Sequence, residues 1–160
     1  MKEYRTADFN KTTGYLKSGI YCLTIDELIN HKILGGTSQR QTLIKSLKEA
    51  CEFYWSYGID EIYANGSFAT MKPIPNDIDG YLYVDESDKG LLQVINSGSV
   101  WGKFYGLHNT KDKFPMWYDK KIEFYLEIKG QEIYHNFFTH SRDGIERGII
   151  KIIQGDNKND

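Results

Sequence analysis

The sequence predicts a single α/β domain in which a long helix packs on a β-sheet. With 160 residues, the chain has the length of one ordinary domain with one buried core. Apolar residues recur at helical spacing over 38–57, whereas 78–84 and 122–128 alternate between apolar and polar residues, as half-buried strands do. Hydrophobic residues make up 40% and charged residues 26% of the chain, which excludes disorder, collagen-like repeats and disulfide scaffolds.

Two helix starts are marked by capping residues. The first helix is expected at 24–31, where Thr24 would be the N-cap and Glu27, three residues later, would complete a capping box. The long helix is expected at 38–57 with Ser38 as its cap. It is the longest periodic segment of the chain, so it should cover one face of the sheet.

Four segments have the composition of strands, namely 59–64, 78–84, 122–128 and the β-branched run 148–153. In 122–128 the apolar residues point inward and the glutamates and tyrosine outward. Gly80 takes an inward position in 78–84, which indicates that another group packs closely against it.

The other segments carry weaker signals. Residues 1–18 are polar and aperiodic and form either a mobile lead-in or an arm that docks late, and 154–160 is a polar tail. A short helix is expected at 88–96, and 97–120 is expected to be irregular. No repeat or linker divides the rest, so 19–153 is one domain.

The residues suited to chemistry gather between two of these strands. Gly66 and Ser67 can direct backbone amides and a hydroxyl at an anion, and Lys72 can contact phosphate. Asp77 and Asp79 lie on one face of a strand, about 6–7 Å apart, and a cation such as magnesium would relieve their repulsion. The alternative interpretation is that Asp77 and Asp79 lie on a solvated strand face, that Ser67 is a turn serine that caps its own loop, and that Lys72 is a solvated loop lysine.

This segment resembles a known pattern. The string Gly-Ser-Phe-Ala-Thr-Met-Lys-Pro-Ile-Pro-Asn-Asp-Ile-Asp at 66–79 is similar to the signature of the polymerase-beta-like nucleotidyltransferase superfamily. It is closest in form to small bacterial and phage nucleotidyltransferase-like proteins with Gly-Ser-Phe-x-Thr-x-Lys-x-x-Pro-Asn-Asp-Ile-Asp. Segments 23–28 and 142–150 are also similar to that family.

The resemblance implies a nucleotidyltransferase-like mixed β-sheet flanked by helices, with Mg²⁺ or Mn²⁺ and a nucleoside triphosphate bound at the strand ends. Asp77 and Asp79 match the two metal-binding carboxylates. Glu123 stands where the superfamily places a third carboxylate that activates the attacking hydroxyl, and Glu127 is the alternative. Outward glutamates are also what any half-exposed sheet shows. A glutamate in place of the usual aspartate would shift the ligand oxygens by about a bond length.

The resemblance also implies the nucleotide contacts and the reaction. Gly66, Ser67 and Lys72 would bind the triphosphate, while Asp77, Asp79 and Glu123 would be the catalytic and metal-binding residues. The expected activity is transfer of a nucleoside monophosphate to a hydroxyl of a protein, an RNA or a small molecule, in a toxin–antitoxin or phage-defence setting. The competing hypothesis is a nucleotide- or partner-binding module that kept the fold and lost turnover.

Charge and hydropathy also argue against several other classes of protein. A formal net charge of −2 argues against bulk binding of duplex DNA, and no apolar run has the roughly 20 residues of a membrane-spanning helix. The polar opening segment lacks the core of a signal peptide, so we expect a cytoplasmic protein without membrane contact. Cys22 and Cys51 are expected to be free thiols, although the sequence does not exclude one disulfide. Arg142 and Arg147 are expected to form surface ion pairs, and the aromatic residues of 101–125 to form core.

Overall fold

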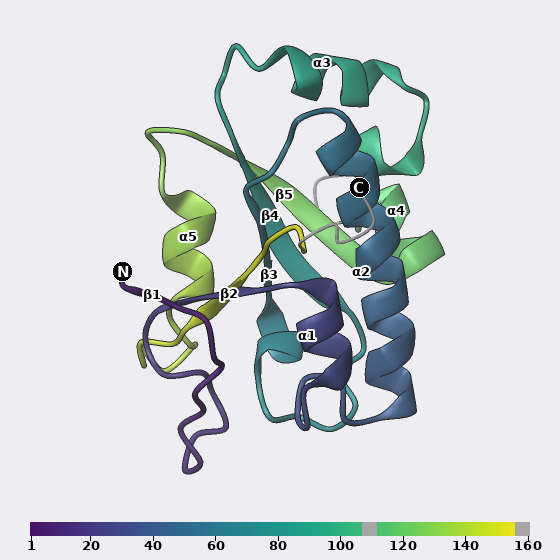
Figure 1. Ribbon diagram of the computed structural model, residues 1–160. Helices are drawn as coiled ribbons and strands as arrows, with labels where there is room; N and C mark the ends of the chain where they lie inside the picture. The colour runs from purple at the N-terminus through teal and green to yellow at the C-terminus, as the bar shows by residue number, and fades with distance from the viewer. Residues whose placement is uncertain (107–111, 156–160) are drawn as a thin grey trace.

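A mixed β-sheet with helices on both faces forms the structure, as Figure 1 shows. The computed structural model describes residues 1–106 and 112–155. The strands are β1 (Glu3–Tyr4), β2 (Ile20–Leu23), β3 (Ile62–Asn65), β4 (Ile78–Val84), β5 (Ile122–Ile128) and β6 (Ile149–Ile152). The helices are α1 (Ile25–Asn30), α2 (Ser38–Ser56), α3 (Lys89–Asn96), α4 (Pro115–Lys120) and α5 (Ile133–Phe138). The predicted α/β class with a mixed sheet is therefore confirmed.

The sheet has the order β1-β2-β6-β3-β4-β5. Strand β3 runs antiparallel to both of its neighbours, β4 and β6, whereas β4 and β5 are parallel. The register places Asp79 of β4 opposite Asn65 of β3 on one side and opposite Glu123 of β5 on the other. Three polar residues thus form a row across the strands at one end of the sheet.

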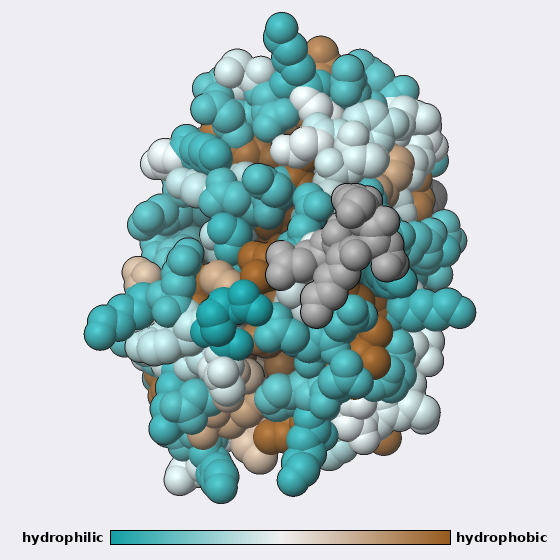
Figure 2. Space-filling view, viewed as in Figure 1, coloured by the Kyte–Doolittle hydropathy of each residue, from teal (hydrophilic) through white to brown (hydrophobic). Residues whose placement is uncertain are grey.

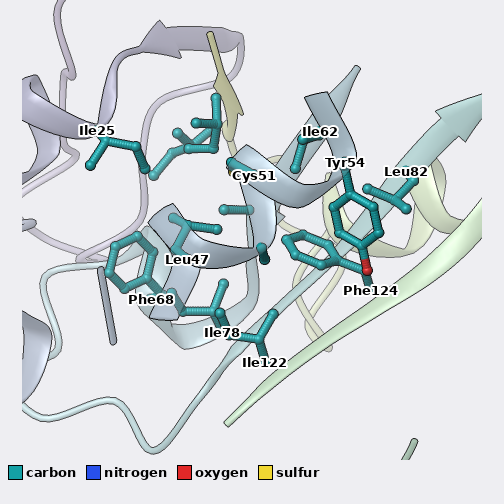
Figure 3. Close-up of a cluster of buried hydrophobic side chains, with 14 of the residues drawn as sticks. Ile25, Leu47, Cys51, Tyr54, Ile62, Phe68, Ile78, Leu82, Ile122 and Phe124 are labelled. Carbon is teal, nitrogen blue, oxygen red and sulfur yellow. The ribbon is translucent and has the colours of Figure 1, made fainter. Parts of the chain in front are cut away.

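Helix α2 covers one face of the sheet and contributes most of the core there. Tyr54 packs edge-to-face on Phe124 of β5, with ring centroids 5.8 Å apart, and its hydroxyl donates to the carbonyl oxygen of Trp101 at 2.8 Å. Figure 3 shows Tyr54 and Phe124 close to Leu82 of β4, all of them buried. The helix therefore holds the two strands that carry the predicted carboxylates.

Helix α5 lies on the opposite side of the sheet (Figure 1). Its Phe138 stacks on Tyr81 of β4 with ring centroids 6.1 Å apart, and Tyr81 stacks on Tyr63 of β3 at 4.6 Å. Glu123 and Glu127 are each 1% exposed. The start of α5 contacts Glu127, whereas Phe114, just before α4, contacts Glu123. The alternative that these outward glutamates belong to a half-exposed face of the sheet is therefore wrong.

Most predicted elements agree with the structure, with two corrections. The capping box of Thr24 and Glu27 is present at α1. At α2, however, the N-cap is Thr37, not Ser38, because the Thr37 hydroxyl accepts the hydrogen bond from the backbone N–H of Arg40. The segment 97–120 is not wholly irregular, since it contains α4 and a 3-10 turn at Val100–Gly102.

The polar N-terminal segment is docked on the domain. Strand β1 pairs with β2, and the carbonyl oxygen of Gly14 accepts a hydrogen bond of 2.8 Å from the N–H of Met71. Leu16 is fully buried in the core. Of the two alternatives for 1–18, the structure has the docked arm.

Most of the exposed residues of the protein are polar, and its two cysteines are buried. The face of the molecule in Figure 2 is largely hydrophilic, with hydrophobic side chains visible in small patches. Among the described residues, no helix combines the length and the apolar composition needed to cross a bilayer. Cys22 and Cys51 are both free and buried.

Candidate functional site

The site is built on the loop between β3 and β4. Gly66 begins a 3-10 turn, Gly66–Ala69, with φ of +70°, a conformation that favours glycine. A Cβ atom on Gly66 would lie 3.3 Å from the Cβ of Asp79 and 3.4 Å from its Oδ2 atom. Glycine therefore allows the turn to lie directly against the Asp79 side chain.

Arg40 of α2 fixes the course of this loop. Its guanidinium donates to the carbonyl oxygens of Phe68 at 2.9 Å, Thr70 at 2.7 Å and Lys72 at 2.7 Å, and more weakly to that of Leu34 at 3.3 Å. The side chain is almost fully buried, and burial lowers its pKa to about 10. This buried cation is satisfied by backbone dipoles, and it makes the loop part of the rigid core.

Asp79 lies beside the turn, on the sheet face that α5 covers. Burial, followed by repulsion from Asp77, raises the pKa of its carboxyl from 3.8 to about 6, and Glu123 adds to the effect while Lys113 opposes it. Its Oδ1 atom is buried and has no hydrogen-bond partner among the described residues. Such an orphaned carboxylate oxygen is characteristic of a site that binds a ligand.

Asn65, opposite Asp79 on β3, adds to this pattern. The residue is fully buried, and neither its Oδ1 nor its Nδ2 atom has a partner in the described part of the chain. The Nε atom of Arg147, next to the Gly66 turn, is likewise buried and unpartnered. Buried polar atoms without partners are rare, and Asn65, Asp79 and Arg147 bring four of them to the surroundings of the Gly66 turn, which makes this region the candidate site.

Asp77 occupies a different environment from Asp79. It directly precedes β4, and its Oδ2 atom accepts a hydrogen bond of 2.7 Å from the indole N–H of Trp117 in α4. The ammonium group of Lys121 lies 3.9 Å from the centre of that indole ring. Trp117 and the two charged residues therefore tie α4 to the start of β4.

Glu123 has its carboxylate fully engaged. Its Oε2 atom accepts a hydrogen bond of 2.6 Å from the N–H of Phe114, and its Oε1 atom accepts one of 2.6 Å from the Tyr125 hydroxyl. Lys113 places its ammonium nitrogen 3.7 Å from the same Oε1 atom. Glu123 thus fixes the entry into α4. Glu127, the alternative, accepts hydrogen bonds from the N–H groups of Tyr134 and His135 at the start of α5.

The donor set fits a metal ion only in part. Carboxylate oxygens of Asp77 and Asp79 and the orphaned amide oxygen of Asn65 are ligands of the kind that magnesium prefers. The Glu123 oxygens already have donors. In the part of the chain that the structure describes, no three His, Cys, Asp or Glu side chains are grouped so that they could hold a metal ion.

A cavity of about 940 Å³ brings several of the predicted residues together. Gly66, Ser67, Lys72 and Asp79 line it from the β3–β4 side, whereas Asp77 and Glu123 are not among its lining residues. Other lining residues come from the N-terminal arm, from α5 and from the segment that follows α5, namely Tyr15, Asn136, Phe137, Phe138, His140, Ser141, Arg142, Asp143 and Arg147. The cavity is therefore assembled from segments far apart in the sequence.

The two arginines correct a sequence-based expectation. Arg142 and Arg147 line this cavity, and within the described residues neither forms an ion pair with a carboxylate. Arg147 donates from Nη2 to the carbonyl oxygen of Gly66 at 2.7 Å, and its guanidinium lies 4.7 Å from the centre of the Tyr15 ring. The neighbouring acids Asp143 and Glu146 indicated ion pairs at the surface, but in the fold the Arg147 side chain points to the loop that begins at Gly66.

A family model matches residues 7–153, and its description is a family of unknown function, DUF6932. The chain belongs to this family. The DUF6932 match includes the β3–β4 loop and the C-terminal arginines, so the whole cavity lies within the family domain. No curated protein and no solved structure matches the chain.

Sequence reasoning missed Asn65, Arg40 and the cavity wall formed by α5. Asn65 directly precedes the predicted Gly66, whereas Arg40 lies in the long helix, and the spacing gives no sign that its side chain reaches the loop carbonyls. Helix α5 has only six residues, Ile133–Phe138, with Ile133 and Phe137 exposed, so it lacks a helical pattern of buried positions. Only the similarity of 142–150 to the suspected family pointed toward this wall.

Proposed function

We propose that this protein is a metal-dependent nucleotidyltransferase that transfers a nucleoside monophosphate from a nucleoside triphosphate to a hydroxyl acceptor. The observation that carries the proposal is the cavity in which the Gly66–Ser67 turn, Lys72 and the orphaned carboxylate of Asp79 meet. Backbone amides, a hydroxyl and an ammonium group suit phosphates, and a carboxylate suits the accompanying cation.

The reaction is an in-line displacement at the α-phosphorus. The acceptor oxygen forms a bond to this phosphorus while the bond to the bridging oxygen of the β-phosphate breaks, and pyrophosphate leaves with the electron pair. The hydroxyl proton passes to a carboxylate of the site. Asp77 and Asp79 would hold the Mg²⁺ or Mn²⁺ ion, which supplies charge neutralisation for the triphosphate. The acceptor is a hydroxyl of a protein, an RNA or a small molecule.

Glu123 is the residue on which turnover depends in this proposal. It lies directly opposite Asp79 in the parallel register of β4 and β5, where a third carboxylate would be needed. Its Oε1 atom must exchange its present donor, the Tyr125 hydroxyl, for the acceptor hydroxyl. Glu123 is 1% exposed and does not line the cavity, so this exchange also requires the residues that cover its carboxylate to move.

The engagement of Glu123 also favours a second candidate function. A nucleotide-binding module without turnover would need the cavity but no free third carboxylate, and Glu123 is held by Phe114 and Tyr125. Incubation with magnesium and nucleotides labelled at the α-phosphate separates the two. Label transfer to a co-purified protein or RNA with release of pyrophosphate identifies the enzyme, whereas binding without pyrophosphate identifies the module.

Thermal melting tests the ligand class itself. With magnesium and a nucleoside triphosphate at a hundredfold excess over Kd, the wild type should gain about 2.7 kcal/mol of stability over the protein in chelator. Asp79→Asn should gain little of this. Asp60→Asn, a control at an exposed position outside the cavity, should behave like the wild type. If no nucleoside triphosphate raises the melting temperature of the wild type in magnesium, both candidate functions are refuted.

A further inference from the structure

Among the described residues, Arg147 of the cavity forms no ion pair with a carboxylate. Arg147 is half-buried, and burial lowers the pKa of its guanidinium. A guanidinium carries five N–H donor groups. Within residues 1–106 and 112–155, the hydrogen bond from Nη2 to the Gly66 carbonyl is the one that the Arg147 side chain forms, and its Nε atom is buried without a partner.

Arg40 shows that this lack of partners is not a general property of buried arginines in the protein. Arg40 is more deeply buried than Arg147 and also has no carboxylate partner among the described residues, yet it donates to four different carbonyl oxygens. Its hydrogen-bonding capacity is used within the fold. Within the described residues, the side chain of half-buried Arg147 uses fewer of its donors, and the Gly66 carbonyl and the Tyr15 ring are the groups that compensate for the burial of its charge.

Arg147 is also fixed in position. The Gly66 carbonyl holds one edge of its guanidinium, and the Tyr15 ring lies 4.7 Å from the guanidinium carbon. A planar donor group held in this way is arranged for a multidentate anion such as phosphate. Its place beside the Gly66–Ser67 turn puts it next to the backbone amides proposed to meet the same ligand.

The charges around Arg147 favour more than one phosphate. Lys72, Arg142 and Arg147 line the cavity together with the acids Asp79 and Asp143 and with His140. Arg142 is exposed and, among the described residues, forms no ion pair. A ligand bound in this cavity can therefore contact the two arginines and Lys72 at several points, as a chain of phosphates would.

We propose that Arg147 and Arg142 bind the terminal phosphates of a nucleoside triphosphate in the cavity that Lys72 also lines. The inference rests on the proposed function for the identity of the ligand but not for turnover. In the enzyme, these arginines would stabilise the negative charge that develops on the departing pyrophosphate. In a binding module, they would anchor the nucleotide by the same phosphates.

Titration with inorganic tripolyphosphate, in chelator and again in magnesium, tests the arginines without a nucleoside. The wild type should bind in at least one condition, and Arg147→Gln and Arg142→Gln should each weaken binding about tenfold, or 1.4 kcal/mol. Arg147→Lys, which keeps the charge but loses the planar donor group, should lie between wild type and Arg147→Gln. Arg5→Gln is the matched control, because exposed Arg5 pairs with Glu27 and does not line the cavity.

Arg142→Gln keeps the test decisive if Arg147→Gln lowers the melting temperature, because Arg142 is exposed and forms no ion pair within the described part of the chain. No binding by the wild type, or equal binding by the wild type and both glutamine variants, overturns the inference. Nucleotide binding that is unchanged in both variants also overturns it and leaves the proposed function standing. Arginine-dependent binding of tripolyphosphate without binding of any nucleotide refutes the proposed function alone.

Discussion

The Asp79 carboxyl couples the stability of the ligand-free protein to pH. Its pKa of about 6 in the fold exceeds the ordinary value of 3.8, so folding favours the protonated form. The stabilising contribution is complete below about pH 4 and is lost as pH rises through about 6, amounting to about 3 kcal/mol at most. Asp79→Asn should abolish this part of the pH dependence in chelator, measured by urea unfolding across that range. An unchanged pH profile would show that Asp79 is ionised without penalty.

Arg40 should be the most sensitive single position in the loop region. Arg40→Met leaves the carbonyl oxygens of Phe68, Thr70 and Lys72 without their donor, and we expect a loss of about 3 kcal/mol in the free energy of unfolding. Arg40→Lys keeps the charge but not the planar donor group, so its loss should be smaller. The control Lys48→Met, at an exposed position of the same helix, should stay within about 0.5 kcal/mol. Equal urea midpoints for Arg40→Met and Lys48→Met would contradict this role.

At the level of elements, the pairing of β3 with β4 depends on Gly80. A Cβ atom at this position would overlap the carbonyl oxygen of Tyr63 and crowd the Phe124 ring at 3.0 Å. Gly80→Ala should therefore cost more than about 3 kcal/mol, because the backbone of β3 must move. Gly98→Ala, where no atom would contact the added methyl group, should cost about 1–2 kcal/mol from its positive φ alone. Similar melting temperatures of the two variants would disprove the close approach.

The elements that sequence analysis predicted share one physical property: the periodic pattern of apolar and polar residues that defines each of them lies within its own segment. Strands β4 and β5 were expected at 78–84 and 122–128 and occupy those residues, because apolar and polar positions alternate along them. The close approach at Gly80 was also expected. In contrast, β1, β2 and α5 are short and gain their order from partners distant in sequence.

The residues of the candidate site likewise fall into those that the sequence predicts and those whose roles arise only from tertiary contacts. Gly66, Ser67, Lys72 and Asp79 could be predicted because they lie within one continuous string and in one cavity. The state of Glu123 could not, because its donors come from α4 and from its own strand after folding. The role of Arg147 depends on the approach of the C-terminal segment to Gly66, which no local pattern indicates.

For the whole molecule, one core predicts one unfolding transition. The larger cluster of buried side chains includes residues of α1, α2, β3, β4, β5, β6 and α4, so these elements should lose their packing together. Far-ultraviolet circular dichroism follows the helices, and fluorescence follows Trp55, Trp101 and Trp117 in three separate segments. The two signals should give the same midpoint in urea. Separate midpoints would mean that the region of α3 and α4 folds as a unit of its own.

The two buried thiols allow opening of the fold to be followed at two depths. Cys51 is 0% exposed in the centre of α2, whereas Cys22 is 8% exposed in β2, toward the end of the sheet where β1 contributes only two residues. A thiol-specific reagent modifies each sulfur only when its surroundings open. Cys51 should therefore be modified at the rate of global unfolding, and Cys22 through smaller openings in which the β1 side of the sheet detaches while α2 stays packed. Mass spectrometry of partly modified protein would resolve the two events in the unaltered chain.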